Sequence, residues 1–388
     1  MTGFMVKGWC PSALRPMASG DGLVVRVRPR GGRLTPAQAS GVAELAQAFG
    51  NGLIDLTGRA NLQIRGVRDI DSGALAIALD RLGLVDRDAD LEAQRNVLVA
   101  PFWLAGDDTH LLAAELERAL AAMPLGLPDK FGFAVDCGDS RVLAQVPADV
   151  RIERGAQGGL IVRAEGTAEG RAVAREQAVP TALALANWFV TTGGANDGRG
   201  RMAAHIASGI KLPHTLSGVA RPAAAVAAPS PCVHPAGALV ALVFGQLRSE
   251  TLGLLARLAP GLRMTPWRMV LVEDYREMPE YEGIVTRADD PLLRVTACTG
   301  APACPEAHVE TRKLAAALAA GISKGSHLHV SGCAKGCAHP GPANITLVGT
   351  SDGFDLVRDG CARDVPSLRG LDPATILAEA PTTLMGAR

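Results

Sequence analysis

The chain has 388 residues, of which 48% are hydrophobic and 20% are charged, a composition that excludes a disordered or fibrous protein. Basic and acidic residues both number 39, so the net charge gives no reason to expect nucleic acid as a partner. No apolar run has the length of a membrane span, and the first residues lack the apolar core of a signal peptide. We therefore expect two or three globular units in the cytoplasm, with no membrane or nucleic-acid partner.

The first half alternates predicted strands and helices. Residues 22–30 alternate as a strand, with Leu23, Val25 and Val27 on one face and arginines on the other. Thr35-Pro36 is typical of a helix start, and Gly50 of its end. Further on we predict helices over 72–83, 109–123 and 179–190 and strands over 94–100, 130–136 and parts of 141–165.

The segment 59–65 is predicted to be a strand with one unusually polar face. Its period of two turns Ala60, Leu62 and Ile64 toward the core. The opposite face then carries Arg59, Asn61, Gln63 and Arg65. Two guanidiniums and two amides in a row are typical of a surface that binds carboxylates. The same pattern also fits the solvated outer face of an antiparallel sheet.

The second half repeats the first. Residues 196–236 are rich in Gly, Pro and Ala and are the candidate linker. After them, residues 238–273 repeat the strand, helix, strand, strand order of 22–67, and 292–333 mirror 94–136. This indicates an internal duplication with pseudo-twofold symmetry.

Four of the eight cysteines form two pairs, Cys298 with Cys304 and Cys333 with Cys337. Each pair follows an alternating segment, and Cys304-Pro305 is predicted to open a helix that runs to about residue 320. Four thiolates on tight loops beside a helix N-terminus favour a [4Fe–4S] cluster, whose negative charge the helix end offsets. The alternatives are zinc, disulfides and free buried thiols, although structural zinc prefers shorter spacers and disulfides are rare in the cytoplasm. We interpret the other four as buried small apolar residues: Cys10, Cys137, Cys232 and Cys361.

Histidines accompany the second cysteine pair. Alternation over 327–333 places His327, His329, Ser331 and Cys333 on one face. A histidine on the cysteine's face suits iron ligation or proton transfer, and the alternative is a hydrogen-bonded core histidine. His234 and His339 lie in predicted loops and are weaker candidates.

The spacing Cys-x5-Cys followed by Ser-Gly-Cys-x3-Cys resembles the [4Fe–4S] motif of the nitrite and sulfite reductase superfamily. Sequence words along the chain resemble one branch of it, the precorrin-3B synthases of aerobic cobalamin biosynthesis. The words are Arg15-Pro16 and residues 8–12, 19–22, 56–66, 265–268 and 331–338. The resemblance implies an α+β fold of two pseudo-twofold-related halves, each a ferredoxin-like half-domain plus a sulfite-reductase-hemoprotein-like α/β domain. The corresponding division is 1–75 and 76–195 for the first half, 196–236 for the linker, and 237–285 and 286–388 for the second half, which alone carries the cluster.

In this branch the polycarboxylate precorrin-3A would be the substrate, at the place where the reductases hold siroheme. The resemblance implies hydroxylation at C20 by O2 with lactone formation, a [4Fe–4S] cluster and a mononuclear non-heme iron. No nicotinamide-binding motif follows a strand, so an external NADH-linked reductase is expected to supply electrons. The implied cluster ligands are Cys298, Cys304, Cys333 and Cys337. The implied substrate-binding residues are Arg26, Arg28, Arg59, Asn61, Gln63, Arg65 and Arg95, and the candidate catalytic residues are Lys130, His329 and Lys335.

Two other functions remain open. One is a siroheme-dependent nitrite or sulfite reductase, which Gly132 disfavours, because sulfite reductases have a second lysine there. The other is a non-enzymatic iron–sulfur or zinc carrier, which would have no use for the polar strand at 59–65.

Overall fold

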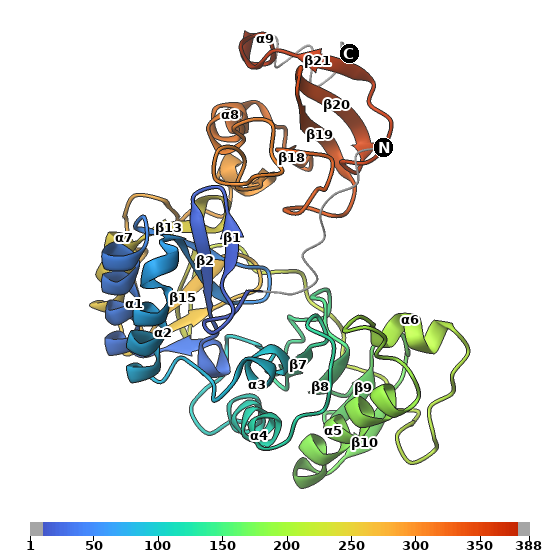
Figure 1. Cartoon of the computed structure of the whole chain (residues 1–388). Helices are drawn as coiled ribbons and strands as arrows, with labels where there is room; N and C mark the ends of the chain where they lie inside the picture. Colours follow the sequence, from blue (N-terminus) through green and yellow to red (C-terminus); the bar gives the residue numbers. More distant parts are fainter. Residues whose placement is uncertain (1–10, 379–388) are drawn as a thin grey trace.

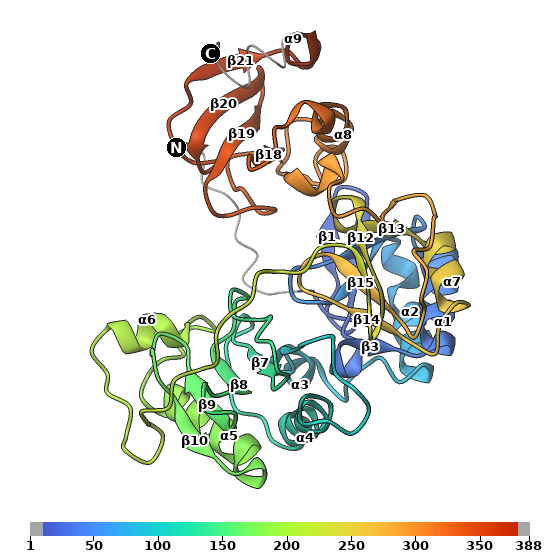
Figure 2. The ribbon, with the colours of Figure 1, turned by 180° about the vertical axis from the view of Figure 1, so that it is seen from behind.

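The computed structural model describes residues 11–378. Figure 1 shows three bodies: a central one built from both halves of the chain (blue and yellow), a green one from the first half, and an orange-to-red one from the second. The green and red bodies flank the central one in both views, Figure 1 and Figure 2. Across residues 11–378, every helix falls short of the length or the apolar character that a bilayer crossing requires.

The central body contains two sheets that exchange an edge strand between the halves. The first sheet has the order β1 (Met17–Ser19), β2 (Gly22–Val27), β5 (Leu62–Val67), β4 (Leu53–Leu56), β13 (Gln246–Arg248). The second has the order β11 (Cys232–His234), β12 (Gly237–Leu242), β15 (Met269–Glu273), β14 (Leu262–Met264), β3 (Arg33–Leu34), and β16 (Ile284–Val285) also pairs with β12. Thus β13 of the second half completes the sheet of the first half, and β3 completes the sheet of the second. The exchange ties the two halves into one core.

Helices α1 (Pro36–Phe49), α2 (Ser72–Arg81) and α7 (Ser249–Ala256) lie on the outer side of the central body (Figures 1 and 2). Helix α1 begins as the sequence predicts: the Thr35 side chain accepts a hydrogen bond from the Gln38 backbone, the Gln38 side chain returns the bond, and Pro36 is the first helical residue. The apolar faces of these helices pack on the sheets, where Val42, Ile64 and Leu252 are fully buried.

The two flanking bodies repeat one topology. The first has the sheet order β10 (Arg171–Val173), β9 (Leu160–Ala164), β8 (Val150–Arg154), β7 (Phe133–Asp136), β6 (Val97–Val99), with helices α3 (Ala89–Gln94), α4 (Asp108–Ala122), α5 (Arg175–Thr191) and α6 (Met202–Ala207). The second has the order β17 (Val295–Ala297), β18 (Leu328–Ser331), β19 (Ala343–Thr350), β20 (Gly353–Gly360), β21 (Leu368–Leu371), with α8 (Arg312–Leu318) and α9 (Pro373–Ala378). In both, the three strands that come first in the chain pair in parallel and the rest pair antiparallel.

The duplication extends to single backbone angles. Ala60 and Arg268 take equivalent places just before β5 and β15, and both have a positive φ, of 56° and 59°. Gly66 and Asp274 form a second such pair, at 71° and 56°. A positive φ is uncommon outside glycine, so its repetition at Ala60 and Arg268 supports the internal duplication. The predicted α+β fold with two related halves is confirmed.

The helix predicted to begin at Cys304-Pro305 is wrong. Residues 305–311 form turns, and α8 begins at Arg312. The reason lies in the backbone bonds of this segment, since the His308 N–H bonds to the Gly332 carbonyl of the second cysteine loop. Cys304 therefore does not lie at the first turn of a helix. The stretch predicted as a linker carries α6 and β11, and its backbone bonds to the first flanking body at Arg154 and Gly170.

Candidate functional site

The two cysteine loops leave the same edge of the second flanking sheet. Cys298 follows β17 and Cys333 follows β18, and these strands are parallel neighbours, with Val295 opposite Leu328. The loops also bond to each other, because the Gly332 N–H donates to the Cys298 sulfur at 3.1 Å. An amide that donates to a cysteine sulfur is a contact that iron–sulfur sites use to offset their negative charge.

Electrostatics places the four thiols in one neighbourhood. Burial raises the pKa of the Cys337 thiol, and the negative charges of Cys333, Cys298 and Cys304 raise it further, against the lowering by Lys335. Burial likewise raises the pKa of Cys333, with Cys304 and Cys298 among the further causes. None of the four forms a disulfide. Four free cysteines whose thiolate forms raise the pKa of their neighbours are suited to a positively charged centre.

The four sulfurs are not arranged around a single point. Among residues 11–378, no three His, Cys, Asp or Glu side chains are placed to hold one metal ion. Structural zinc needs its ligands in such a tetrahedron. A cubane cluster binds each cysteine to a different iron at a separate corner, so its ligands stand further apart. The free thiols, the amide donor and the shared sheet edge fit the larger group.

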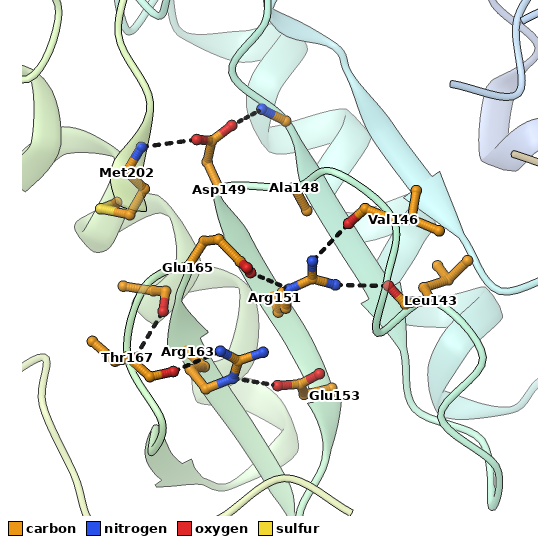
Figure 3. Close-up of polar contacts among 12 residues, drawn as sticks. Leu143, Val146, Ala148, Asp149, Arg151, Glu153, Arg163, Glu165, Thr167 and Met202 are labelled. Atoms are coloured by element: carbon orange, nitrogen blue, oxygen red, sulfur yellow. Dashed lines mark hydrogen bonds and ion pairs between the residues drawn. The ribbon is translucent and has the colours of Figure 1, made fainter. Parts of the chain in front are cut away.

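The first flanking body shows what replaces the cysteines in the other half. The loop after β7 is fixed by Arg151, which donates to the carbonyls of Leu143 and Val146 at 2.8 and 2.6 Å (Figure 3). Asp136 accepts from the Leu143 N–H at 2.7 Å. By strand register, Ser331 and Thr346 stand where Asp136 and Arg151 stand in the first half. They bond to Cys333 and Gly360 carbonyls, so the loop that carries the cysteines lacks this ionic anchor.

The ionic network around Arg151 is extensive and buried. Asp149 bonds to Arg201 and accepts from the backbone N–H of Gly132. It also accepts from the Met202 N–H, and Arg163 bonds to Glu153 at 2.6 Å (Figure 3). Every one of these charges except Arg201 is nearly inaccessible. Paired and hydrogen-bonded, the network is a structural element of the half without cysteines.

Three histidines gather beside the second cysteine loop. The rings of His327 and His339 lie 4.5 Å apart and those of His329 and His339 lie 5.6 Å apart. Burial and the neighbouring His339 lower the pKa of both His327 and His329 to about 4, so both are neutral near pH 7. His329 is fully buried, and within the described chain neither of its ring nitrogens has a hydrogen-bond partner. The predicted alternation is confirmed, and the expected core hydrogen bond is missing.

The polar face of the first sheet holds a free cation. Arg26 and Gln63 are opposite each other on β2 and β5, and Gln63 is opposite Asp55 on β4. Arg26 is half-buried, and its Nε is buried without a partner among the described residues. A guanidinium held this way is ready for a carboxylate.

Three other predicted substrate residues are occupied by the protein itself. Arg95 is buried and bonds to Asp86 at 2.8 Å. Arg28 is buried beside Glu92, with a hydrogen bond to Asn96. Arg65 binds Asp21 at 2.7 Å. Asp21 lies in the quoted word 19–22 and Asp86 and Glu92 lie before Arg95, but no spacing within a strand indicates that the fold brings these carboxylates to the arginines.

The remaining candidates are scattered. Arg59 lies in a turn before β5 and donates to the Lys130 carbonyl at 2.9 Å, while Lys130 itself is exposed. Asn61 is buried in the same turn, and Lys335 is half-buried in the second cysteine loop. Hence the structure brings Arg26 and Gln63 together, brings Arg59 to Lys130, and places His329 near the cysteines.

Sequence reasoning missed Arg268 as a site residue. It donates to the Ala338 carbonyl, next to Cys337, at 3.1 Å. Burial and Arg312 lower its pKa, and the charges of Asp55 and Cys298 raise it. Two features of the sequence could have indicated Arg268. It ends the quoted word 265–268, and the internal duplication makes it the equivalent of Ala60 in the polar segment of the first half.

The other cysteines have mixed positions. Cys137 is buried, as predicted, and burial raises its pKa to about 12. Cys361 is only partly buried. Cys232 is exposed, so that prediction is wrong, because β11 is an edge strand of the second sheet. Cys10 lies outside the described residues.

Comparisons with known proteins agree with this geometry. Residues 15–82 match the family model of the nitrite/sulfite reductase ferredoxin-like half domain. The solved structure of the Mycobacterium tuberculosis NirA protein superposes with a TM-score of 0.63 at 18% identity, over 94% of this chain and 82% of that one, which shows a shared fold. A ferredoxin–nitrite reductase of Leptolyngbya laminosa is 29% identical, but over only 36% of this chain and 29% of its own length.

One relative matches along nearly the whole chain. A precorrin-3B synthase of a Sinorhizobium species is 32% identical, over 94% of this chain and 85% of its own length. The chain therefore belongs to the precorrin-3B synthase family, a branch of the nitrite and sulfite reductase superfamily.

Proposed function

We propose that this chain is a precorrin-3B synthase, an oxidoreductase that hydroxylates precorrin-3A at C20 with O2 and closes a lactone from the ring A acetate. The observation that carries the proposal is the similarity along 94% of the chain to a precorrin-3B synthase, against partial similarity to nitrite reductases. A monooxygenase puts one atom of O2 into the product and releases the other as water, which consumes two electrons and two protons. NADH is the proposed source of the electrons.

The cluster is proposed to sit between the two cysteine loops, held by Cys298, Cys304, Cys333 and Cys337. When bound, a [4Fe–4S] cluster supplies electrons one at a time. The Gly332 amide lies at the Cys298 sulfur to offset added negative charge. A pocket of about 580 Å³ beside Cys333 gives an external NADH-linked reductase a place to approach. Free cysteines throughout the described chain suit the reducing cytoplasm, where we place the reaction.

The substrate is proposed to meet the polar face of the first sheet. Arg26 offers a guanidinium whose buried Nε has no hydrogen-bond partner among residues 11–378, and Gln63 offers an amide beside it. Together they bind and orient carboxylates of the macrocycle. Arg59 and Lys130 lie at the edge of this face and extend the cationic surface. Arg28, Arg65 and Arg95 are not part of the proposed carboxylate site, because each already binds a protein carboxylate.

His329 is proposed to manage a proton in the reaction. With a pKa of about 4 the ring is neutral at physiological pH. One of its two ring nitrogens can then accept a proton while the other donates one, and neither has a hydrogen-bond partner within the described chain. Lys335, in the cysteine loop, remains a candidate for the same task. The family expectation also includes a mononuclear iron. Residues 11–378 offer no set of three converging ligands for it, and we assign it no step.

The direct test incubates the anaerobically purified protein with precorrin-3A, NADH, a reductase and 18O2. We expect a product heavier by one labelled oxygen, and we expect iron and acid-labile sulfide on the same sample. A protein that contains zinc alone would overturn the redox assignment. A protein that leaves precorrin-3A unchanged while containing the cluster would overturn the substrate.

A siroheme-dependent reductase is the second candidate. It is supported by the partial similarity to two ferredoxin–nitrite reductases and by the shared fold with the NirA protein. Gly132 stands against it, since the second lysine of sulfite reductases is absent there. Sharp siroheme absorption bands in the purified protein, with nitrite or sulfite turnover, would favour this candidate over the first.

A further inference from the structure

The two cysteine loops are each bonded to an arginine of the central body. Arg65, on β5 of the first half, donates from Nη2 to the Ala303 carbonyl at 3.1 Å. Arg268, just before β15 of the second half, donates from Nη2 to the Ala338 carbonyl at 3.1 Å. Ala303 directly precedes Cys304, and Ala338 directly follows Cys337. Each half therefore supplies one arginine, and each arginine binds the residue next to the second cysteine of one pair.

Both arginines are held firmly. The Arg65 side chain is 7% exposed and is oriented by Asp21, which bonds to its Nε and Nη2 at 3.1 and 2.7 Å. Arg268 has a φ of 59°, an uncommon backbone state for a bulky residue, and strain of this kind is retained where function requires it. Gly245 lies close under it, because a Cβ there would come within 2.6 Å of the Arg268 Cδ.

The Ala303 carbonyl shows how specific the contact is. It accepts three hydrogen bonds, from Arg65, from the Ser19 hydroxyl at 2.6 Å and from the Gly20 N–H at 3.0 Å. Gly20 is required for this approach, since a Cβ at that position would lie 2.0 Å from the Pro302 carbonyl oxygen. The β1–β2 hairpin is therefore shaped to receive the first cysteine loop.

The second loop depends on its arginine for a different reason. In the first half, Asp136 and Arg151 anchor the corresponding loop from within its own body. The cysteine loop has Ser331 and Thr346 at those places, and Arg268 contacts it from the neighbouring body. The anchor has thus moved from inside the flanking body to the central body.

We propose that Arg65 and Arg268 are positioning residues that hold the two cysteine loops at the separation a cluster needs, and that the central body thereby prepares the site before the cluster is inserted. The proposal rests on the proposed function, in which these four cysteines bind the cluster. It explains why an arginine predicted to bind substrate is instead enclosed by protein groups. The polar face of the first sheet would then have two roles: Arg26 on it binds substrate, and Arg65 on it binds the first cysteine loop.

The experiment measures alkylation of the four thiols by iodoacetamide in the cluster-free full chain, resolved by mass spectrometry. The variants are Arg65→Gln and Arg268→Gln, each with a lysine counterpart that keeps a cationic donor. The matched control is Arg33→Gln, because Arg33 is an arginine of the central body that also donates to a backbone carbonyl, that of Pro260 at 2.7 Å, and it bonds to no cysteine loop in the described contacts. Loss of one hydrogen bond to a charged donor predicts that R65Q raises the alkylation rate of Cys304, and R268Q that of Cys337, about fivefold over wild type.

The lysine variants are expected to return both alkylation rates most of the way to the wild-type values, and R33Q is expected to leave the two rates unchanged. Equal alkylation rates in wild type and both glutamine variants, or a uniform rise of all four thiols in either one, would overturn the proposal. After reconstitution, the Arg65 and Arg268 variants should shift the cluster's reduction potential, while wild type and R33Q should agree. If wild type takes up no cluster, the proposed function fails; if it takes up a cluster and the thiol rates are equal, only the positioning role fails.

Discussion

The carboxylate of Asp55 accepts a hydrogen bond from the guanidinium of Arg312 at 3.1 Å, and so joins β4 of the central body to helix α8 of the second flanking body. Asp55 also lies 3.7 Å from the Arg65 Nε and accepts from the Gln246 side chain at 2.9 Å. One carboxylate on the first sheet therefore contacts both halves of the chain and the body that carries the cysteines. Its charged neighbours are the cations Arg65 and Arg312, and the Asp55 carboxylate balances their positive charge.

Replacing Asp55 with Asn is expected to lower the free energy of unfolding by about 1–3 kcal/mol, because Arg312 then loses its counter-charge and Arg65 keeps only Asp21. Urea unfolding followed by circular dichroism measures the change. The control is Asp289→Asn, whose partner Arg287 is exposed, so this ion pair should contribute nothing measurable. Equal destabilisation by both variants would contradict the role given to Asp55.

Asp136 predicts a pH-dependent stability. Burial raises its pKa from 3.8 to about 6, and its Oδ1 has no partner within the described chain. The folded state thus binds the proton more tightly than the unfolded state, so stability falls as pH rises from about 4 to about 6 and the cost persists above that.

Asp136→Asn removes that cost and keeps an oxygen for the Leu143 N–H. We expect stabilisation of about 3 kcal/mol at pH 8, the value of a two-unit pKa shift, and almost none at pH 4. Thermal melts at the two pH values check this. A gain that is the same at both would show that the carboxyl titrates normally.

The sequence predicted those elements whose two faces differ clearly. In β18, Leu328 and Val330 pack on the core with α8, while His329 takes the other face, as alternation required. The duplication and the strand order were equally visible, because each half repeats its apolar pattern at the same spacing. Local signals failed where a distant backbone competed: Pro305 is a good helix start, yet His308 bonds to Gly332 across the loop.

The roles of the arginines could not be predicted from the sequence. Arg26, Arg65 and Arg95 all stand near a polar strand or motif and differ only in the carboxylates that the fold brings to them. Asp21 reaches Arg65 and Asp86 reaches Arg95, whereas no carboxylate of the described chain bonds to Arg26. Spacing within one strand cannot reveal a partner that arrives from another loop.

His329 is expected to reduce stability for the sake of function. A fully buried ring with two unpaired nitrogens costs free energy, so His329→Leu should stabilise the protein by about 1 kcal/mol at pH 7. The gap should widen as pH falls, because the unfolded ring takes up a proton near pH 6.5 and the folded ring only near pH 4. The same variant should lose conversion of precorrin-3A. A stabilised variant with full conversion would remove His329 from the reaction.

Arg26 and Arg28 form a matched pair for testing the substrate surface, since they are two residues apart on or next to one strand and differ in their partners. Arg26 is free to bind a carboxylate, whereas Arg28 is buried beside Glu92.

Arg26→Gln is expected to weaken binding of precorrin-3A about tenfold, the loss of one charge-assisted bond, and to leave the free energy of unfolding unchanged. Arg28→Gln is expected to do the reverse: it leaves Glu92 without its cation and lowers the free energy of unfolding by about 3 kcal/mol. Absorption titration of the tetrapyrrole and urea unfolding on the same samples separate the two effects. Equal affinity of the wild type and the Arg26 variant would move the carboxylate site away from the first sheet.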